Sequence, residues 1–435
     1  MDSIPIDDGG DWQDLRSTTE TLLHQLEAIF TPGTPVAERD MLVGRRFEID
    51  TLKRAIVRPG QHAIIYGERG VGKTSLAEVA RDRRTAGFSG TAYARVSAHV
   101  GMHTDELWFG VFRELQKACQ ASMGFFQKRG IPLRPVAGPA IATPDEIRSA
   151  LQDLGVPVVV MLDEVDRIGP GLTMSMLTDT VKALADTRAD VTLVLIGVGE
   201  SVQDLMHEHR SIVRSLEPIP VSRMSEDELI GILDRAKVID VRFDRPESCH
   251  IVRASTGLPY LVHLLGRLAA INTIRNRRLF VNHDDVRVAV KIASANDLSR
   301  RDYYAATVSS RLPNLYASVL LASAISATDE DGWFATPSVK RVLSQLLRRD
   351  CAVQDFQSHL SALCGDGRGP VLKRRGTRRM YQYRFVNSEL RAYVVLRHLA
   401  LGEIDFADLP PIAPASLIVS GAWQSPSMQA IGVAA

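Results

Sequence analysis

The stretch that decides the fold is His62-Ala-Ile-Ile-Tyr-Gly-Glu-Arg-Gly-Val-Gly-Lys-Thr74. Its apolar start predicts a buried strand, and helical periodicity follows its last two residues. The three glycines of the loop let backbone N–H groups converge on phosphate oxygens, and the start of the following helix adds partial positive charge. The stretch therefore predicts a loop that binds the phosphates of a nucleotide.

The residues of this P-loop have distinct expected roles. Lys73 should reach the β- and γ-phosphates, and the hydroxyl of Thr74 should bind Mg²⁺. ATP and Mg²⁺ are therefore the predicted cofactors. We expect the nucleotide to be held by Gly67, Glu68, Arg69, Gly70, Val71, Gly72, Lys73, Thr74 and Ser75.

A second chemical signal follows another apolar run, Val158–Leu162, which ends in Asp163 and Glu164. Open α/β sheets bind ligands at the carboxyl ends of their strands, so these two carboxylates should lie near the P-loop. Asp163 is predicted to complete the Mg²⁺ site, and Glu164 to orient or polarise the attacking water. Asp166 is expected either to cap a helix or to pair with an arginine.

The 435 residues exceed what one hydrophobic core usually serves. Strand-like runs alternate with helical periods around the P-loop, which predicts an α/β fold with a doubly wound parallel sheet. Helical periodicity alone follows, beginning with a capping box at Ser225 and Glu228. Three helical stretches and two β-like runs then follow in the order of a winged helix. We predict an N-terminal helical extension at 1–40, the P-loop core at 41–222, a helical lid at 223–300, a winged helix at 301–402 and a poorly ordered tail at 403–435.

Composition excludes several classes of function. The 52 Lys and Arg residues balance 51 Asp and Glu residues, so attraction for nucleic acid requires a local patch. The four cysteines are scattered without metal-ligand spacing, which argues against a zinc site or a disulfide framework and fits a reducing cytoplasm. No apolar run approaches the roughly 18 residues of a membrane span, so no membrane association is expected.

Three motifs together resemble one family: Val43-Gly44-Arg45-Arg46-Phe47-Glu48, the loop at 67–74, and Leu162-Asp163-Glu164. They resemble the AAA+ ATPases, in particular the branch near archaeal origin-recognition initiators and the related STAND signalling ATPases. The resemblance covers about residues 40–300, and the winged-helix pattern extends it to about 400. It implies that Val43 and Gly44 lie against the adenine, beside the helical lid.

Two departures from the family pattern favour a slow switch over fast turnover. The run that ends in Gly197-Val-Gly-Glu-Ser201 lacks the asparagine that many AAA+ proteins use to sense phosphate, and Ser201 is a weak substitute. The segment Thr256-Gly-Leu-Pro-Tyr260 lacks the arginine of a second sensor and resembles the Gly-x-Pro element of STAND proteins. Pro259 is then expected beside the nucleotide, although an ordinary turn between helices would need the same residues.

The family resemblance also implies a homo-oligomer in which a neighbouring subunit supplies an arginine finger. Arg210 and Arg214 lie in the expected region, and their spacing places them on one face of an α-helix. Such a guanidinium would offset charge that develops on the γ-phosphate. Either residue can equally be an ordinary surface arginine.

A basic hairpin is the main argument for a nucleic-acid partner. Five positive charges fall within seven residues, with no acid among them, at Lys373, Arg374, Arg375, Arg378 and Arg379. Wings of winged-helix domains contact DNA phosphates or enter the minor groove. The preceding helical stretch, Gln354–Leu363, would be the recognition helix. The same charges can instead pack inward as a regulatory surface, dock on an acidic protein or remain solvated.

Two functions remain open. The first is a DNA-associated AAA+ ATPase, similar to initiator or transposition-helper proteins, whose nucleotide state controls assembly on DNA. The second is a STAND-type signalling or defence ATPase whose winged helix regulates assembly with a protein partner.

Overall fold

The structure is a computed structural model that describes residues 12–33, 44–81, 90–121, 143–206, 210–310, 314–329, 331–377 and 380–412. Several predicted features lie outside these residues: Val43, Arg378, Arg379 and the tail after residue 412. The side chain of Arg210 is likewise outside the described part, although its backbone is included.

A parallel sheet of five strands forms the first domain, in the order β2-β3-β4-β1-β5. The strands are β1 (His62–Gly67), β2 (Ala92–Ser97), β3 (Val158–Asp163), β4 (Val191–Val198) and β5 (Leu216–Pro220). The prediction of an α/β fold with a parallel sheet is confirmed. The edge strand β5 was not predicted, because Pro218 and Pro220 argue against a strand and are tolerated only at a sheet edge.

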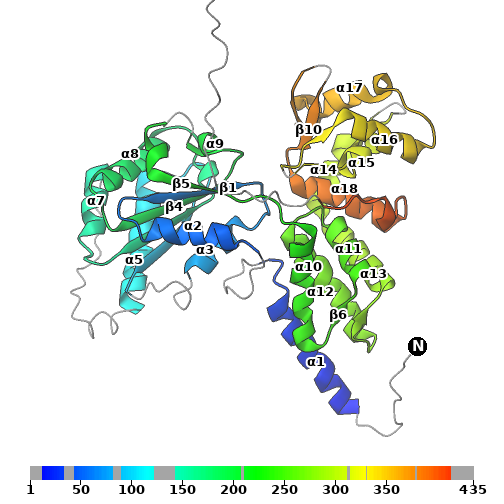
Figure 1. Cartoon of the computed structure of the whole chain (residues 1–435), viewed down its shortest axis with the longest axis horizontal. Helices are drawn as coiled ribbons and strands as arrows, with labels where there is room; N and C mark the ends of the chain where they lie inside the picture. Colours follow the sequence, from blue (N-terminus) through cyan, green and yellow to red (C-terminus); the bar gives the residue numbers. More distant parts are fainter. Residues whose placement is uncertain are drawn as a thin grey trace, which may run out of the picture.

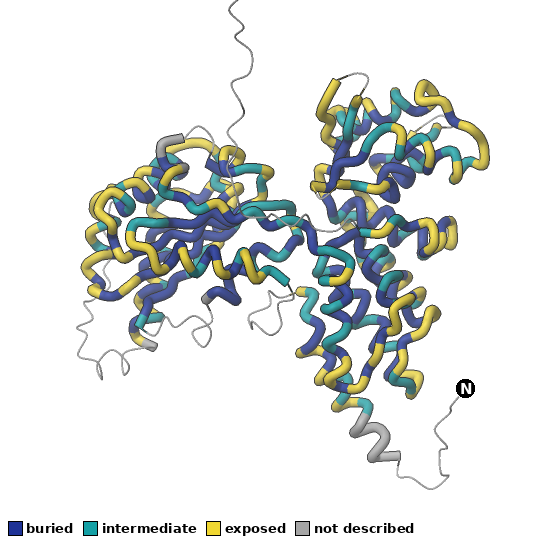
Figure 2. Tube along the Cα trace, in the orientation of Figure 1, coloured by how far each residue is buried: buried dark blue, intermediate teal, exposed yellow. Residues whose placement is uncertain are grey.

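Helices cover both faces of this sheet (Figure 1). One face packs against α2 (Arg46–Ile56) and α3 (Lys73–Arg81). The other packs against α5 (Thr104–Ala121), α7 (Pro144–Gln152) and α8 (Leu172–Asp186). Alternate residues of the strands serve the two cores: Ile64 faces one, and Ala63 and Ile65 face the other. The strands are therefore buried on both sides, as Figure 2 shows, and the P-loop emerges from a rigid support.

A helical lid follows the sheet. It comprises α10 (Glu226–Asp234), α11 (Arg245–Ala254), α12 (Pro259–Arg275) and α13 (His283–Asn296), with the short strand pair β6 (Arg242–Phe243) and β7 (Phe280–Val281). The predicted capping box is present, since the side chain of Ser225 accepts a hydrogen bond from the backbone N–H of Glu228. Helix α1 (Trp12–Ile29) packs on the lid (Figure 1) and contributes Leu26 to its core.

The C-terminal region contains more elements than the sequence pattern predicted. Helix α14 (Leu298–Val308) leads into α15 (Tyr316–Ala324), β8 (Phe334–Ala335), α16 (Thr336–Leu347), α17 (Val353–Leu363), β9 (Leu372–Arg375), β10 (Gln382–Phe385) and α18 (Ser388–Leu401). The three strands form an antiparallel sheet in the order β8-β10-β9. This order of elements fits a winged helix, which stays a prediction. No described helix is long and apolar enough to cross a membrane.

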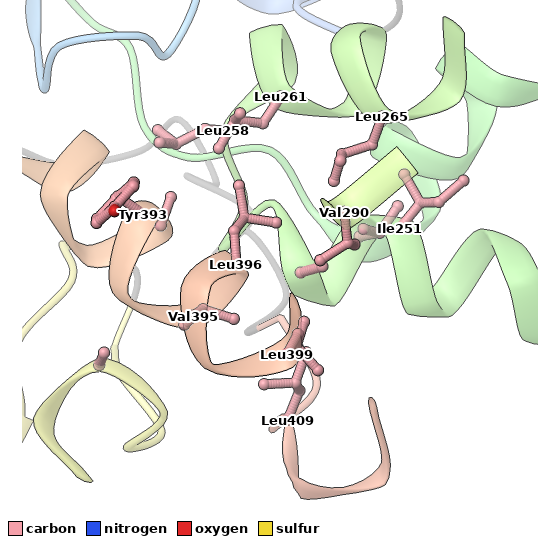
Figure 3. Close-up of a cluster of buried hydrophobic side chains, with 14 of the residues drawn as sticks. Ile251, Leu258, Leu261, Leu265, Val290, Tyr393, Val395, Leu396, Leu399 and Leu409 are labelled. Atoms are coloured by element: carbon pink, nitrogen blue, oxygen red, sulfur yellow. The ribbon is translucent and has the colours of Figure 1, made fainter. Parts of the chain in front are cut away.

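The lid and the C-terminal region share one hydrophobic core. In Figure 3, Leu396 and Leu399 of α18 lie against lid side chains that include Leu261 and Val290. The two faces of the parallel sheet have separate cores. The lid and C-terminal region therefore form one apolar-packed body, called the C-terminal body below, which comprises residues 225–412.

Candidate nucleotide site

The P-loop lies between β1 and α3, as its sequence requires. Gly67, Gly70 and Gly72 have φ angles of 152°, 84° and 98°, a region that L side chains rarely adopt. A Cβ atom on Gly67 would clash with the carbonyl oxygen of Val221, whereas one on Gly72 would enter open space within the loop. The glycines thus allow this loop conformation without strain and keep the loop open, which suits a phosphate cradle.

Lys73 is folded back onto its own loop. Its Nζ donates hydrogen bonds to the carbonyl oxygens of Gly67 at 3.1 Å and Glu68 at 2.6 Å. The residue is only 8% exposed, and this burial lowers the pKa of its ammonium group to about 8. The Lys73 ammonium group would therefore offer an anion in the loop both a hydrogen-bond donor and a positive charge that is poorly hydrated.

The predicted magnesium ligands meet. The hydroxyl of Thr74 donates to Oδ2 of Asp163 at 3.0 Å. Arg95 of β2 also contacts Asp163 Oδ2 at 2.8 Å and reaches Glu78 at 2.7 Å. We did not predict Arg95, although an arginine near the carboxyl end of an apolar strand is a detectable signal. Hydroxyl and carboxylate oxygens are the donors that Mg²⁺ accepts, so these residues fit the ion.

Glu164 and Asp166 follow Asp163 but face different partners. Glu164 has left-handed backbone geometry, with φ 56°, and forms an exposed ion pair with Arg167 at 3.1 Å. Asp166 Oδ1 accepts the backbone N–H of Val198 at 2.8 Å and so connects the turn after β3 to the end of β4. Among the described residues Asp166 does not cap a helix, and its pairing with an arginine stays a prediction.

The lid closes over the P-loop. A Cβ atom on Gly70 would lie 3.5 Å from Leu258 and 3.6 Å from Tyr260, which flank Pro259 at the start of α12. At the edge of the core, Gly44 faces the Glu228 side chain of the lid, and a Cβ atom there would clash with a Glu228 carboxylate oxygen, so the glutamate would have to shift. The structure thus brings Gly44 and Pro259 to the boundary between core and lid, where we expected the adenine. Their contact with adenine stays a prediction.

The region of the predicted sensor and finger differs from expectation. Ser201 Oγ accepts the N–H of Asp204 at 3.2 Å, so this hydroxyl caps the short helix α9 (Val202–Met206). Residues Arg210–Ser215 form a 3-10 helix rather than an α-helix. With three residues per turn, positions four apart do not share a face. The prediction that Arg210 and Arg214 lie on one helical face is therefore wrong, although Arg214 is exposed.

The C-terminal body contacts the P-loop directly. Glu68 pairs with Arg384 of β10 at 3.9 Å. It also pairs at 2.8 Å with Arg223, in the segment that joins β5 to the lid. Arg384 also pairs with Glu200, two positions after β4, and Lys373 reaches the same carboxylate at 3.3 Å. A cavity of about 190 Å³ lies among these side chains. These contacts join segments far apart in the sequence, so no local pattern could have predicted them.

Further contacts tighten this junction. Ser388 Oγ donates to the carbonyl oxygen of Arg69 at 3.2 Å, and Arg69 pairs with Glu389 at 3.8 Å. Gly332 has φ 81°, and a Cβ atom there would lie 2.8 Å from an Arg223 nitrogen and 3.1 Å from Glu68. Only glycine therefore allows the loop before β8 to approach the P-loop this closely.

The described part of the basic hairpin already has partners within the chain. The Arg374 guanidinium lies 4.4 Å from the centre of the Tyr381 ring. Arg375 lies 4.2 Å from the Trp333 ring and 3.4 Å from the Asp329 carboxylate. The residues of β9 after Leu372 are nonetheless exposed. Their contact with DNA stays a prediction.

Comparison with known proteins agrees with this geometry. Residues 57–206 match the family model described as AAA domain. A Walker-type ATPase of Pyrococcus abyssi is 17% identical, with a TM-score of 0.51, over 84% of this chain and 99% of that one. The ORC2 protein of Aeropyrum pernix is 16% identical, with a TM-score of 0.47, over 86% and 98%. The RuvB Holliday junction motor of Thermotoga maritima is 14% identical, with a TM-score of 0.40, over 79% and 93%.

The first of these structures supports the fold. No curated protein sequence matches. The AAA-domain match covers the strand, the P-loop and the acidic turn that the geometry brings together. Residues 57–206 therefore form an AAA domain, which contains the P-loop.

Proposed function

We propose that this chain is a Mg²⁺-ATP-dependent switch whose basic C-terminal sheet docks on the P-loop and is released for DNA contact when ATP binds. One observation carries the proposal: Arg384 pairs with both Glu68 of the P-loop and Glu200 at the end of β4. We expect nucleotide phosphates to bind close to Glu68 and Glu200, where they would add negative charge. The C-terminal body is thus coupled to the part of the core that distinguishes ATP from ADP.

The residues of the core have the following proposed roles. Lys73 transfers its hydrogen bonds from the carbonyls of its own loop to phosphate oxygens, and Thr74 and Asp163 hold the metal ion. Bound Mg²⁺ would neutralise charge on the β- and γ-phosphates. Glu164 orients the water molecule after leaving Arg167, a weak restraint because both side chains are nearly half exposed. Arg210 or Arg214 of a neighbouring subunit is the proposed finger in a homo-oligomer.

The chemistry of the junction suits reversible docking. The C-terminal body is held together by an apolar core. The contacts reported above that join β9, β10 and the start of α18 to the parallel-sheet domain are ion pairs and one hydrogen bond. Such pairs exchange readily for water or for another anion. ATP phosphates beside Lys73 would compete with Glu68 and Glu200 for Arg384. Once the Arg384 contacts are lost, Glu200 is paired only with Lys373 of the sheet, and we propose that the sheet can then separate from the P-loop.

Docking and DNA contact would exclude each other. Lys373 pairs with Glu200 of the parallel-sheet domain, so this ammonium group is not free for a DNA phosphate in the docked form. Arg375 pairs with Asp329 within the C-terminal body, so DNA would have to replace that carboxylate as well. We propose that α15–α17 and the β8-β10-β9 sheet form a winged helix and that its wing engages DNA after release, in the cytoplasm. The same ion pairs support a second candidate, a STAND-type signalling ATPase, because the basic sheet already accepts protein carboxylates as partners.

A DNA-binding experiment separates the two candidates. Anisotropy of a labelled duplex is measured with ATP and with ADP across a salt series. Glu200→Gln should raise the affinity without ATP, and Lys373→Ala with Arg375→Ala should lower it and make the salt slope shallower by about one unit per lost contact. Lys182→Ala, which removes an exposed charge from α8, is the matched control and should change nothing.

The outcomes are distinct. The signalling candidate would be favoured if Glu200→Gln, Lys373→Ala and Arg375→Ala all leave DNA affinity unchanged while Glu200→Gln alters ATP hydrolysis or self-assembly. If neither DNA affinity nor hydrolysis responds to Glu200→Gln, the proposed switch is wrong.

A further inference from the structure

A second cavity, with both apolar and polar walls, lies where the lid, α15, α18 and the last described residues meet. Its volume is about 30 Å³, measured as the space that the centre of a water molecule can occupy. Val395 and Leu409, which also belong to the hydrophobic cluster of Figure 3, form part of its apolar wall. Its polar lining includes Arg223, Arg253, Thr256, Thr328, Asp329 and Arg391.

Arg391 is the unusual member of this lining. The residue is 6% exposed, and it donates from Nε to the carbonyl of Ala324 at 2.8 Å and from Nη2 to that of Ser326 at 3.2 Å. A guanidinium has five N–H donors, so three remain. Within the described part of the chain, no carboxylate forms an ion pair with Arg391. Burial and the nearby charge of Arg223 lower its pKa to about 9, which still leaves it protonated at pH 7.

The other charges of the lining are already paired. Arg223 pairs with Glu68 and Arg253 with Glu226. Asp329 accepts the backbone N–H groups of Asp331 at 3.1 Å and Trp333 at 2.8 Å, and its other oxygen pairs with Arg375. The positive charge of Arg391 is thus the one left without a counter-charge among the described groups that line the cavity. A buried charge in this condition favours a bound anion.

Thr256 gives a second, independent sign of a ligand. It is 5% exposed, and its hydroxyl has no hydrogen-bond partner among the described residues. Its backbone is also left-handed, with φ 53°, which a β-branched residue rarely adopts. Buried hydroxyl groups almost always have a partner, so the cavity is the place to seek one.

We propose that this cavity binds a small divalent oxyanion of the phosphate or sulfate class, with Arg391 as counter-charge and Thr256 as hydroxyl donor. One water needs about 10–15 Å³ by the same measure, so the cavity admits a small oxyanion but not a nucleotide. The anion would join the lid, through Thr256, to α18, through Arg391. This cavity shares Arg223 with the cavity beside the P-loop, but the proposed anion ligands Arg391 and Thr256 are not part of the nucleotide site, and the proposal does not require the switch.

Thermal unfolding of the full chain tests the site with inorganic phosphate as the probe. The Lys73→Ala background removes phosphate binding at the P-loop, and chloride at equal ionic strength is the reference. Phosphate and sulfate should raise the apparent Tm in a concentration-dependent manner, by about 2 °C or more, and acetate should not. Adding Thr256→Val should abolish most of this rise. Thr178→Val, which removes a buried hydroxyl from α8, should leave it unchanged.

Direct binding keeps the proposal testable if Thr256→Val does not fold. Equilibrium dialysis of the Lys73→Ala protein against radiolabelled phosphate should find about one bound ion per chain. The proposal is overturned if no phosphate binds, if the rise in Tm survives Thr256→Val, or if acetate stabilises equally. In the first case the cavity holds only water.

Discussion

Replacing Arg384 with Met should release the C-terminal sheet from the P-loop. The Arg384 side chain is 10% exposed, and it pairs with Glu68, which is 19% exposed, and with Glu200, which is 43% exposed. Removing one partner of a buried pair costs about 3–5 kcal/mol, whereas exposed pairs contribute about 0–1 kcal/mol. Because the exposure of these side chains is intermediate, we expect the free energy of docking to weaken by about 2 kcal/mol. This change would increase the undocked population roughly 30-fold.

The expected consequence is tighter ATP binding. If only the undocked form binds ATP well, the apparent Kd falls by up to about 30-fold, because it varies inversely with the competent fraction. Titration with a fluorescent ATP analogue measures this change. Arg374→Met is the matched control, because Arg374 is in β9 and lies over the ring of Tyr381, which precedes β10. Unchanged ATP affinity in an Arg384→Met protein that small-angle scattering shows to be undocked would refute the coupling.

Three further predictions follow from the site and the fold. Lys73→Ala should abolish nucleotide binding, whereas Glu164→Gln should keep binding and slow phosphate release; equal loss of binding in both would contradict their roles. Mixing an Arg210→Ala, Arg214→Ala protein with the Glu164→Gln protein should restore some hydrolysis, and no recovery in demonstrated mixed assemblies would exclude a finger in trans. His62 is fully buried, and burial lowers its pKa to about 4 from an ordinary 6.5. The unfolded chain therefore binds the extra proton, and stability should fall as the pH drops from 6.5 towards 4, by about 2 kcal/mol at pH 5. Urea unfolding at pH 7 and pH 5 should show a smaller difference in the free energy of unfolding for His62→Gln than for the unchanged protein. An equal difference would contradict the role given to His62.

Local chemistry explains what the sequence predicted. The P-loop is a short segment whose glycines, lysine and threonine act within a few residues of one another, so its strand, loop and helix could be located. The apolar run before Asp163 likewise identified β3 and the acidic turn. The edge strand β5 was missed because of its prolines, and the two-residue strand β8 is too short to show any periodicity.

The features that the sequence did not predict depend on tertiary contacts. Arg95 reaches Asp163 only because β2 pairs with β3, and Glu68 meets Arg223 across 155 positions of sequence. The basic hairpin was visible as a charge cluster, but its acidic partners Glu200 and Asp329 lie in other elements. A charge pattern alone could not distinguish a free DNA-binding wing from one already docked within the chain.

The distance between the parallel-sheet domain and the C-terminal body tests the central claim most directly. Spin labels at Lys182 of α8 and at Arg349 after α16 lie on exposed positions of the two parts, and a cysteine-free background keeps the labelling specific. Double electron–electron resonance should show a single docked distance without nucleotide and a second, altered distance with Mg²⁺-ATP. Lys73→Ala should keep the docked distance in both conditions. An unchanged distance distribution in protein that has demonstrably bound ATP would contradict the proposed release.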